Sequence, residues 1–277
     1  MGYFGSKHRL ADRLISLMPP HRGYVEPFAG SLSVLARKEP APIEVANDLN
    51  ADLLTFWRVL RDRQDDLERA CLLTPHSREE HAASFELTPD PYDEVEHARR
   101  VWVRLAQGRA GQFTPTGWRH HQSTHKVGQG GMAQRLTAYV GRFAPVAARL
   151  RNVSLECRPA SEVIEAYGRD ADTLLYVDPP YLGSTRTKSA QGYAVELNTE
   201  EQHAELAEQL HQCAATVLLS GYPSDLYDHL YDRWHRVDLS AWTGQGNRRA
   251  ARTEVVWSNR PLMHDQTEGV AQTALAI

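Results

Sequence analysis

The stretch TLLYVDPPY, residues 173–181, contains the features that decide the fold. Its first five residues are apolar and partly β-branched, which is typical of a buried strand. Asp178, Pro179 and Pro180 follow directly, and two prolines can neither donate to a β-ladder nor continue a sheet. Tyr181 then adds an aromatic ring. The stretch therefore predicts a strand that ends abruptly in a carboxylate, a rigid turn and a ring.

Strand and helix patterns alternate on both sides of this stretch. Repeated strand–helix units imply a mainly parallel sheet that is covered on both faces. The fold class expected is α/β, with a Rossmann-like sheet. The expected strands are 24–28, 43–46, 153–157, 173–177, 216–220, 236–239 and 254–258, and the expected helices are 7–18, 32–38, 49–62, 161–167, 200–213 and 224–231.

The alternation is interrupted between residues 63 and 150, where the pattern is mostly helical around a Gly/Pro/Thr-rich segment, GRAGQFTPTGW. Such a segment predicts a loop or hairpin. We therefore expect a discontinuous domain, 1–62 with 151–262, a mostly helical insertion at 63–150, and a flexible polar tail at 263–277.

Composition excludes several classes of protein. The chain has 277 residues, of which 42% are hydrophobic, and these are ordinary values for a globular protein. No apolar run is long enough for a membrane span, and the first 20 residues do not resemble a signal peptide. The three cysteines are far apart, which argues against a disulfide framework and favours a reducing, cytoplasmic location.

Charge is distributed unevenly along the chain. The net charge is −4, yet the 54 residues from Arg99 to Asn152 contain ten Lys and Arg and no Asp or Glu, so the rest of the chain carries −14. A block of one sign in an oppositely charged chain indicates a site for a polyanion such as nucleic acid. The alternative is a basic face that only contacts water.

Two further strand ends carry residues suited to a nucleotide-like ligand. The strand before Glu26 leads into Pro27-Phe28-Ala29-Gly30-Ser31, and the small residues of this turn let a ligand approach the backbone. Asp48 follows the next strand, where a carboxylate can bind ribose hydroxyls. Ligands of α/β sheets bind at such carboxyl ends. The alternative for Asp48 is a cap of the helix that follows.

The Asp178 segment suits chemistry on an exocyclic amine. Such an amine is a poor nucleophile because its lone pair is delocalised into the ring, and hydrogen-bond acceptors on its N–H groups help the nitrogen to pyramidalise. Asp178 offers one acceptor and the Pro179 carbonyl another, with the direction of that carbonyl fixed by the proline φ angles. Tyr181 can stack on the base. The alternative is a proline-rich strand exit with an Asp cap.

Taken in order and spacing, these motifs resemble the Dam-type (class alpha) DNA adenine methyltransferases, whose DNA-reading insertion precedes the catalytic motif. The resemblance covers about residues 2–260. It is carried by GYFGSK at the N-terminus, YVEPFAGS, VANDLNADL, DPPY and the late strand EVVWSN with Asn259.

The resemblance implies a Rossmann-like methyltransferase sheet, S-adenosylmethionine as cofactor and double-stranded DNA as partner, with no metal and no membrane. The activity implied is methylation of the 6-amino group of a flipped-out adenine. Asp178, Pro179, Pro180 and Tyr181 are the implied catalytic residues. The implied cofactor contacts are Tyr3, Gly5, Lys7, Glu26, Pro27, Phe28, Ala29, Gly30, Ser31, Asp48 and Asp178.

DNA contacts are expected from Arg109, Arg119, His120 and Lys126, which lie in or beside GQFTPTGWRHH. This segment departs from the GATC-reading members, so the recognition sequence is not implied. The family's acid for the cofactor adenine is also absent, since Pro159 stands near its place. His120, His121 and His125 lack acidic or Cys neighbours, which favours DNA contact over a metal.

Three alternatives to adenine methylation stay open from the sequence. One is methylation of the cytosine 4-amino group, although such enzymes more often carry Ser in place of Asp178. Another is a catalytically idle DNA-binding homologue, against which Lys7 and the intact DPPY motif argue. A third is methylation of RNA or protein. Neither the oligomeric state nor a restriction partner is indicated.

Overall fold

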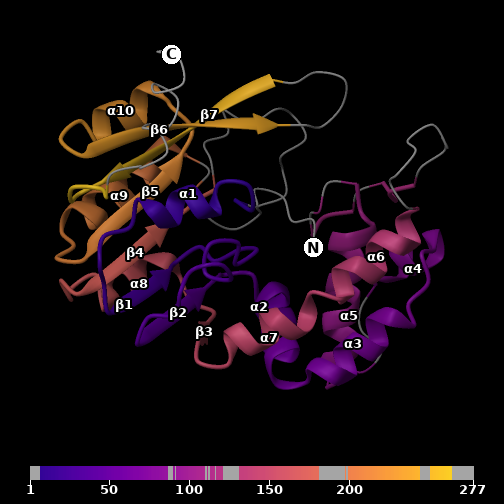
Figure 1. The fold of residues 1–277 in the computed structure, drawn as a ribbon. Helices are drawn as coiled ribbons and strands as arrows, with labels where there is room; N and C mark the ends of the chain where they lie inside the picture. Colours follow the sequence, from indigo (N-terminus) through magenta and orange to yellow (C-terminus); the bar gives the residue numbers. More distant parts are fainter. Residues whose placement is uncertain are drawn as a thin grey trace, which may run out of the picture.

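The computed structural model describes residues 7–86, 90, 92–109, 111, 113–115, 117–120, 131–180, 197, 199–243 and 250–263, with backbone alone at 240–243 and 250–252. A twisted sheet with helices on both faces forms one part of the molecule, and a bundle of helices lies beside it (Figure 1). Within the described ranges, every helix is too short or too polar to span a lipid bilayer.

The sheet has seven strands, and the predicted mainly parallel, Rossmann-like arrangement is confirmed. The last two strands form an antiparallel hairpin whose inner strand pairs with its parallel neighbour. Both hairpin strands are longer than the sequence predicts. In spatial order the strands are β3 (Ser154–Glu156), β2 (Ile43–Asn47), β1 (Gly23–Glu26), β4 (Thr173–Val177), β5 (Thr216–Gly221), β7 (Ala250–Ser258) and β6 (His235–Thr243).

Alternate strand residues build two separate cores, because successive side chains of a strand point to opposite faces. Leu174 and Tyr176 of β4 belong to the core on one face, and Leu175 and Val177 to the core on the other. The first core includes α1 (Ala11–Ser16), α2 (Ala51–Asp62) and α7 (Phe143–Leu150). The second includes α8 (Ala160–Tyr167), α9 (Glu200–His211) and α10 (Asp225–Leu230).

The helical bundle extends the first core away from the sheet. It consists of α3 (Gln64–Leu72), α4 (Arg78–Ala83), α5 (Glu94–Gln107) and α6 (Met132–Val140). Trp102 of α5 is fully buried and Trp57 of α2 nearly so, and both belong to this core. The mostly helical character of residues 63–150 is as predicted, and their role as an insertion that recognises the target stays a prediction. In the fold, α5 and α7 share a core with the sheet.

The helix predicted at 32–38 is wrong, since this segment forms a series of turns. Gly30 and Leu32 have φ angles of 48° and 53°, in the left-handed region that α-helices do not use. The Leu35 N–H donates to the Glu26 carboxylate rather than to a helical carbonyl. The spacing of apolar residues does not predict these turns, because they depend on a hydrogen bond to a side chain nine residues earlier.

Candidate active site

The three strand ends that carry predicted site residues meet at one edge of the sheet. β1 lies between β2 and β4 and is parallel to both, so their carboxyl ends are neighbours. Glu26 ends β1, Asp48 follows β2 and Asp178 follows β4. The sequence predicts these residues to share a site, and the topology brings their backbones together at the edge where α/β sheets bind ligands.

Asp48 holds the turn that follows β1. Its two oxygens accept hydrogen bonds from the N–H groups of Gly30 and Asn50, each at 2.9 Å, and burial raises its pKa. The cap of α2 is Asn50, whose side chain accepts from Leu53 N–H, so Asp48 is not the helix cap. The Gly30 carbonyl accepts from the Trp57 indole at 3.0 Å. The turn is therefore fixed from both sides while Asp48 stays partly exposed.

Asn47, next to Asp48, connects the segments around the candidate site, a role that the sequence does not predict. Its side chain is fully buried and donates to the carbonyls of Pro27 (2.9 Å) and Arg158 (3.0 Å), and it accepts from Arg158 N–H (2.9 Å). The Asn47 carbonyl also accepts from Ala29 N–H. One amide thus joins the segments after β1, β2 and β3. A buried Asn beside a functional Asp, at the end of an apolar strand, is the signal that points to it.

Glu26 faces the interior of the protein. Its Oε1 accepts from the Tyr24 hydroxyl at 2.7 Å and from Leu35 N–H at 2.9 Å, and only 2% of the residue is exposed. Burial raises the pKa of Glu26 to about 8. The expected direct contact with the cofactor stays a prediction. The structure gives the side chain a different task, which is to hold the turn segment 27–35 against the sheet.

Glu26→Gln is expected to flatten the pH dependence of stability. In the folded protein the Glu26 carboxyl stays protonated up to about pH 8, whereas the unfolded chain ionises it near pH 4.5. The folded state then binds more protons, so the free energy of unfolding falls as pH rises through this window, by at most about 1.4 kcal/mol per pH unit. Denaturant unfolding between pH 5 and 8 measures it, and equal slopes in both proteins contradict the assignment.

Asp178 is the centre of a polar cluster at the end of β4. Its Oδ1 accepts from Lys7 Nζ at 2.7 Å and from Ser220 Oγ at 3.0 Å. Lys7 Nζ also lies 3.1 Å from Glu254 Oε1. Burial acts to lower the pKa of Lys7, but the carboxylates of Asp178 and Glu254 outweigh it, and the pKa lies well above its usual value. The sequence predicts Asp178 and Lys7 as site residues but misses Ser220 and Glu254.

The remaining predicted residues divide between the described segments and those outside them. Pro179 and Ala29 are buried, and Pro180, Phe28 and Ser31 are partly exposed. The Ser31 hydroxyl bonds with Ser33. Asn259 bonds the backbone of Val217 and Ala215 where β5 begins, at the opposite edge of the sheet from Asp178. Tyr3, Gly5, Tyr181, His121, His125 and Lys126 lie outside the described residues.

The segment expected to contact DNA begins and ends as the two strands of a hairpin, at residues 108–109 and 117–118. Gly108 and Trp118 form an antiparallel bridge, and Arg109 N–H donates to the Gly117 carbonyl. The Gln107 side chain fixes this base, since its amide donates to Pro75 O and accepts from Ser77 N–H and the Trp118 indole. Gln107 is fully buried, and its hydrogen bonds to residues 75–77 and to Trp118 hold the base of the hairpin in place.

Arg109 and Arg119 differ in their surroundings. Arg109 is exposed and its Nε donates to Trp118 O at 3.3 Å. Arg119 is half-buried, its Nη2 donates to Arg109 O at 2.9 Å, and burial lowers its pKa. His120 stacks on Trp118 with ring centroids 5.3 Å apart. Arg109 is thus better placed to meet a ligand, whereas Arg119 holds the hairpin strands together.

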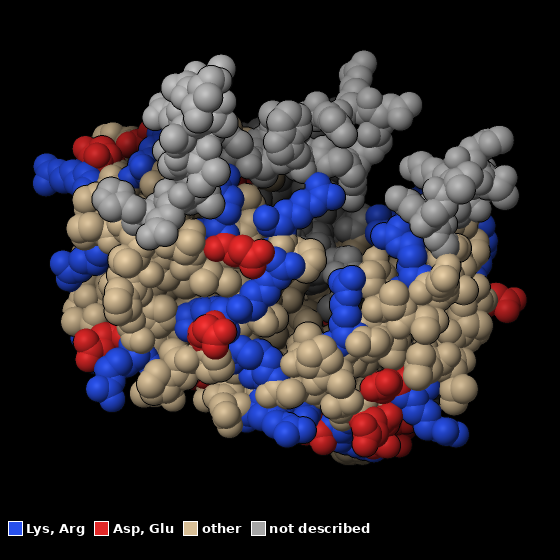
Figure 2. Space-filling model, viewed as in Figure 1, with Lys and Arg blue, Asp and Glu red and all other residues tan. Residues whose placement is uncertain are grey.

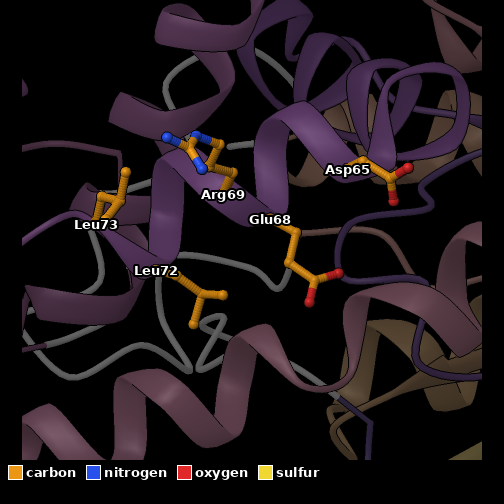
Figure 3. Close-up of a pocket in the computed structure, with 5 residues that line it drawn as sticks. All are labelled: Asp65, Glu68, Arg69, Leu72 and Leu73. Carbon is orange, nitrogen blue, oxygen red and sulfur yellow. The ribbon is translucent and has the colours of Figure 1, made fainter.

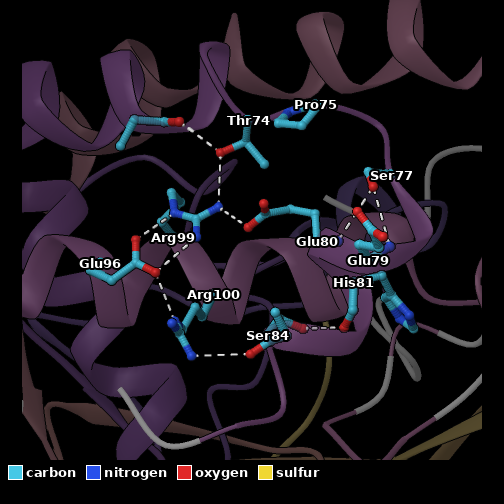
Figure 4. Close-up of polar contacts among 12 residues, drawn as sticks. Thr74, Pro75, Ser77, Glu79, Glu80, His81, Ser84, Glu96, Arg99 and Arg100 are labelled. Atoms are coloured by element: carbon cyan, nitrogen blue, oxygen red, sulfur yellow. Dashed lines mark hydrogen bonds and ion pairs between the residues drawn. The ribbon is translucent and has the colours of Figure 1, made fainter. Parts of the chain in front are cut away.

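Part of the basic block is neutralised by acids outside it. Arg99 and Arg100 both pair with Glu96, and Arg99 also pairs with Glu80 (Figure 4). Two further pairs of the same kind join Arg104 to Asp52 and Arg149 to Glu44. The block is continuous in sequence, but in the fold these four arginines stabilise the protein itself. The positive charge available to a ligand is therefore smaller than the sequence count suggests.

Lys and Arg side chains nevertheless gather where a ligand has access. Figure 2 shows them on both sides of a hollow between the sheet and the helical bundle. A separate surface groove of about 380 Å³ lies on α3, lined by Asp65, Glu68, Arg69, Leu72 and Leu73 (Figure 3). No predicted site residue lines this groove. In the described ranges, His, Cys, Asp and Glu nowhere gather in threes as a metal site requires.

Comparison with known families agrees with this arrangement. Residues 3–243 match the family model for D12 class N6 adenine-specific DNA methyltransferases, and a search of curated proteins finds no match. The match includes the Asp48 turn, the helical insertion, Asp178 and Ser220. A family specific for adenine does not favour the cytosine alternative. The chain belongs to the D12 class N6 adenine-specific DNA methyltransferase family.

Proposed function

We propose that Asp178 and the Pro179 carbonyl bind the 6-amino group of an adenine taken from double-stranded DNA, while the Asp48 turn holds S-adenosylmethionine. The observation that supports this most strongly is the Asp178 cluster at the carboxyl end of β4, two strands from the end of β2, which Asp48 follows. A buried ammonium and a hydroxyl fix a partly exposed carboxylate there.

The residues at the ends of β1 and β2 fit S-adenosylmethionine. Asp48 is partly exposed, and each of its oxygens accepts one backbone N–H, which leaves acceptor capacity for ribose hydroxyls. Ala29 and Gly30 keep the neighbouring turn small. When bound, this cofactor supplies a methyl group on a positively charged sulfur. The chain's residues hold it beside the amine and exclude water.

Asp178 acts on the amine. A carboxylate that accepts an N–H bond draws the nitrogen toward pyramidal geometry and restores its lone pair. As the methyl group arrives, the nitrogen gains positive charge, and a fixed negative oxygen stabilises that charge with little reorganisation. Tyr181 is assigned the task of stacking on the base. The adenine has to leave the duplex to reach these groups, since a stacked base hides its amine.

Duplex DNA is the proposed substrate because of the insertion. Its exposed Arg109 stands on a hairpin base that Gln107 fixes. Basic side chains also lie on both sides of the hollow between the sheet and the helical bundle (Figure 2). The test is transfer of radiolabelled methyl to a duplex, to its separated strands and to the matching RNA duplex. Label in the DNA duplex, recovered as N6-methyladenine, is the expected result. Preferential labelling of RNA contradicts the assignment of the partner.

Arg109→Ala is expected to weaken binding to cognate and scrambled duplexes alike. Loss of one phosphate contact lowers the slope of log affinity against log salt by about 0.9. Fluorescence anisotropy at several salt concentrations measures both quantities. Arg169→Ala is the matched control, because Arg169 is exposed, pairs with Glu165 and follows α8 at the opposite edge of the sheet.

An unchanged salt slope in Arg109→Ala contradicts phosphate contact by this residue. If only the cognate duplex loses affinity, by about 1–3 kcal/mol, Arg109 reads a base instead. Arg119→Ala tests whether this second arginine contacts DNA or only supports the hairpin. Since Arg119 bonds within the hairpin, its loss is expected to lower affinity with a smaller change of slope.

A further inference from the structure

Glu254 and Ser220 stand on two strands that the sequence analysis does not connect with Asp178. Glu254 lies in β7 and Ser220 in β5, and β5 separates β7 from β4 in the sheet. Both are buried, at 4% and 0% exposure. A carboxylate and a hydroxyl inside an apolar sheet are unfavourable unless they are bonded, so their partners indicate their use.

The hydrogen bonds around Asp178 are directional. Ser220 Oγ donates its one proton to Asp178 Oδ1. The bond of 3.1 Å between Ser220 and the Tyr176 hydroxyl must therefore use the Tyr176 proton. Lys7 donates to the same Oδ1. Among the described residues, all bonds to Asp178 arrive at this one oxygen.

Glu254 changes the balance of charge around Asp178. A lone ammonium at 2.7 Å largely offsets the charge of the carboxylate. Glu254 Oε1 lies 3.1 Å from the same ammonium and shares it. By themselves, Asp178, Lys7 and Glu254 carry one net negative charge, which suits an amine nitrogen that becomes positive during methylation.

We propose that Glu254 and Ser220 are positioning residues of the methyl transfer. Ser220 directly, and Glu254 through Lys7, hold Oδ1 of Asp178 so that Oδ2 accepts the hydrogen bond from the adenine amine. This inference rests on the proposed role of Asp178. It adds two residues that touch neither substrate nor cofactor and assigns the two Asp178 oxygens different tasks.

Glu254→Gln is expected to lower the single-turnover rate of methyl transfer about 10- to 100-fold, while the Kd values for S-adenosylmethionine and DNA change less than about threefold. The shape of the side chain is kept and only its charge is lost. Glu254→Asp, which restores the charge, is expected to recover most of the rate. If Glu254 has only a structural role, Glu254→Gln lowers the melting temperature but does not lower the rate selectively while both Kd values are kept.

The decisive comparison is a double-mutant cycle with Lys7→Met. If Glu254 acts through Lys7, Glu254→Gln lowers the remaining rate less than about threefold in the Lys7→Met background. An equal factor in both backgrounds overturns the proposal. Ser220→Ala is expected to lower the rate in either background, because it reaches Asp178 directly.

Glu44→Gln is the matched control for loss of a buried carboxylate. Glu44 is as buried as Glu254 and also holds cations, Arg149 and Lys38, but it lies near the start of β2, at the other edge of the sheet. The Glu44→Gln variant is expected to have a lower melting temperature and an unchanged rate of methyl transfer. If Glu44→Gln lowers the rate like Glu254→Gln, the effect is one of stability. Failure of Asp178→Ala itself to affect transfer would instead overturn the proposed function.

Discussion

Asp178→Ala is expected to abolish measurable methyl transfer while S-adenosylmethionine still binds. The substitution removes the acceptor that acts mainly in the transition state, which costs about 2–4 kcal/mol or more, a loss in rate of roughly 30- to 10³-fold or greater. It also leaves Lys7 paired with Glu254, so these groups lose the net negative charge that stabilises the developing positive nitrogen. Asp48 and its turn are untouched, so binding of S-adenosylmethionine is expected to stay measurable.

The measurement is single-turnover transfer of radiolabelled methyl to a duplex, with cofactor affinity from calorimetry. Asp172→Ala is the control, since Asp172 is exposed and lies just before β4, at the far end of the strand. It is expected to behave as the parent protein. Transfer by Asp178→Ala within threefold of the parent rate would show that the carboxylate is not the acceptor.

Asp48→Ala is expected to weaken binding of S-adenosylmethionine about 10- to 150-fold. Loss of a charged acceptor for ribose hydroxyls costs roughly 1.5–3 kcal/mol. The same change frees the Gly30 N–H, which Asp48 holds at 2.9 Å, so the turn after β1 loses a support as well. Isothermal titration calorimetry gives the Kd of each protein.

Asn50→Ala separates cofactor binding from helix capping. Asn50 caps α2, and removal of such a cap costs about 1 kcal/mol of stability. This variant is expected to unfold at a lower temperature and to bind the cofactor with nearly parental affinity. Equal loss of affinity in the Asp48 and Asn50 variants would mean that both act only by holding α2 and the neighbouring turn.

The sequence predicts β4 correctly, because a short apolar run followed by two prolines permits few other structures. It also predicts that the ends of β1, β2 and β4 lie together, since parallel strands place their carboxyl ends at the same edge of the sheet. The pairing of Ser220 and Glu254 with Asp178 is not predictable in this way. It depends on the spatial order β4-β5-β7, in which β7 pairs antiparallel with β5. The hydrophobic pattern of the sequence does not reveal this pairing.

The basic block shows the same limit in its electrostatics. The nearest acid before Arg149 in the sequence is Glu96, yet Arg149 pairs with Glu44, 105 residues earlier. Arg104 likewise pairs with Asp52. Local charge counts describe the neighbourhood of a residue along the chain, whereas ion pairs depend on its neighbourhood in the fold. Exposure, as at Arg109, is the better guide to a contact with DNA.

The direct test of the account is single-molecule sequencing of DNA from cells that express the parent protein or Asp178→Ala. The parent protein is expected to leave N6-methyladenine at one recurring sequence, and the variant to leave none above the level of cells without the gene. This comparison identifies the modified base, its sequence context and its dependence on Asp178 together. Methylation in the variant at the same positions, or N4-methylcytosine in place of N6-methyladenine, would contradict the account.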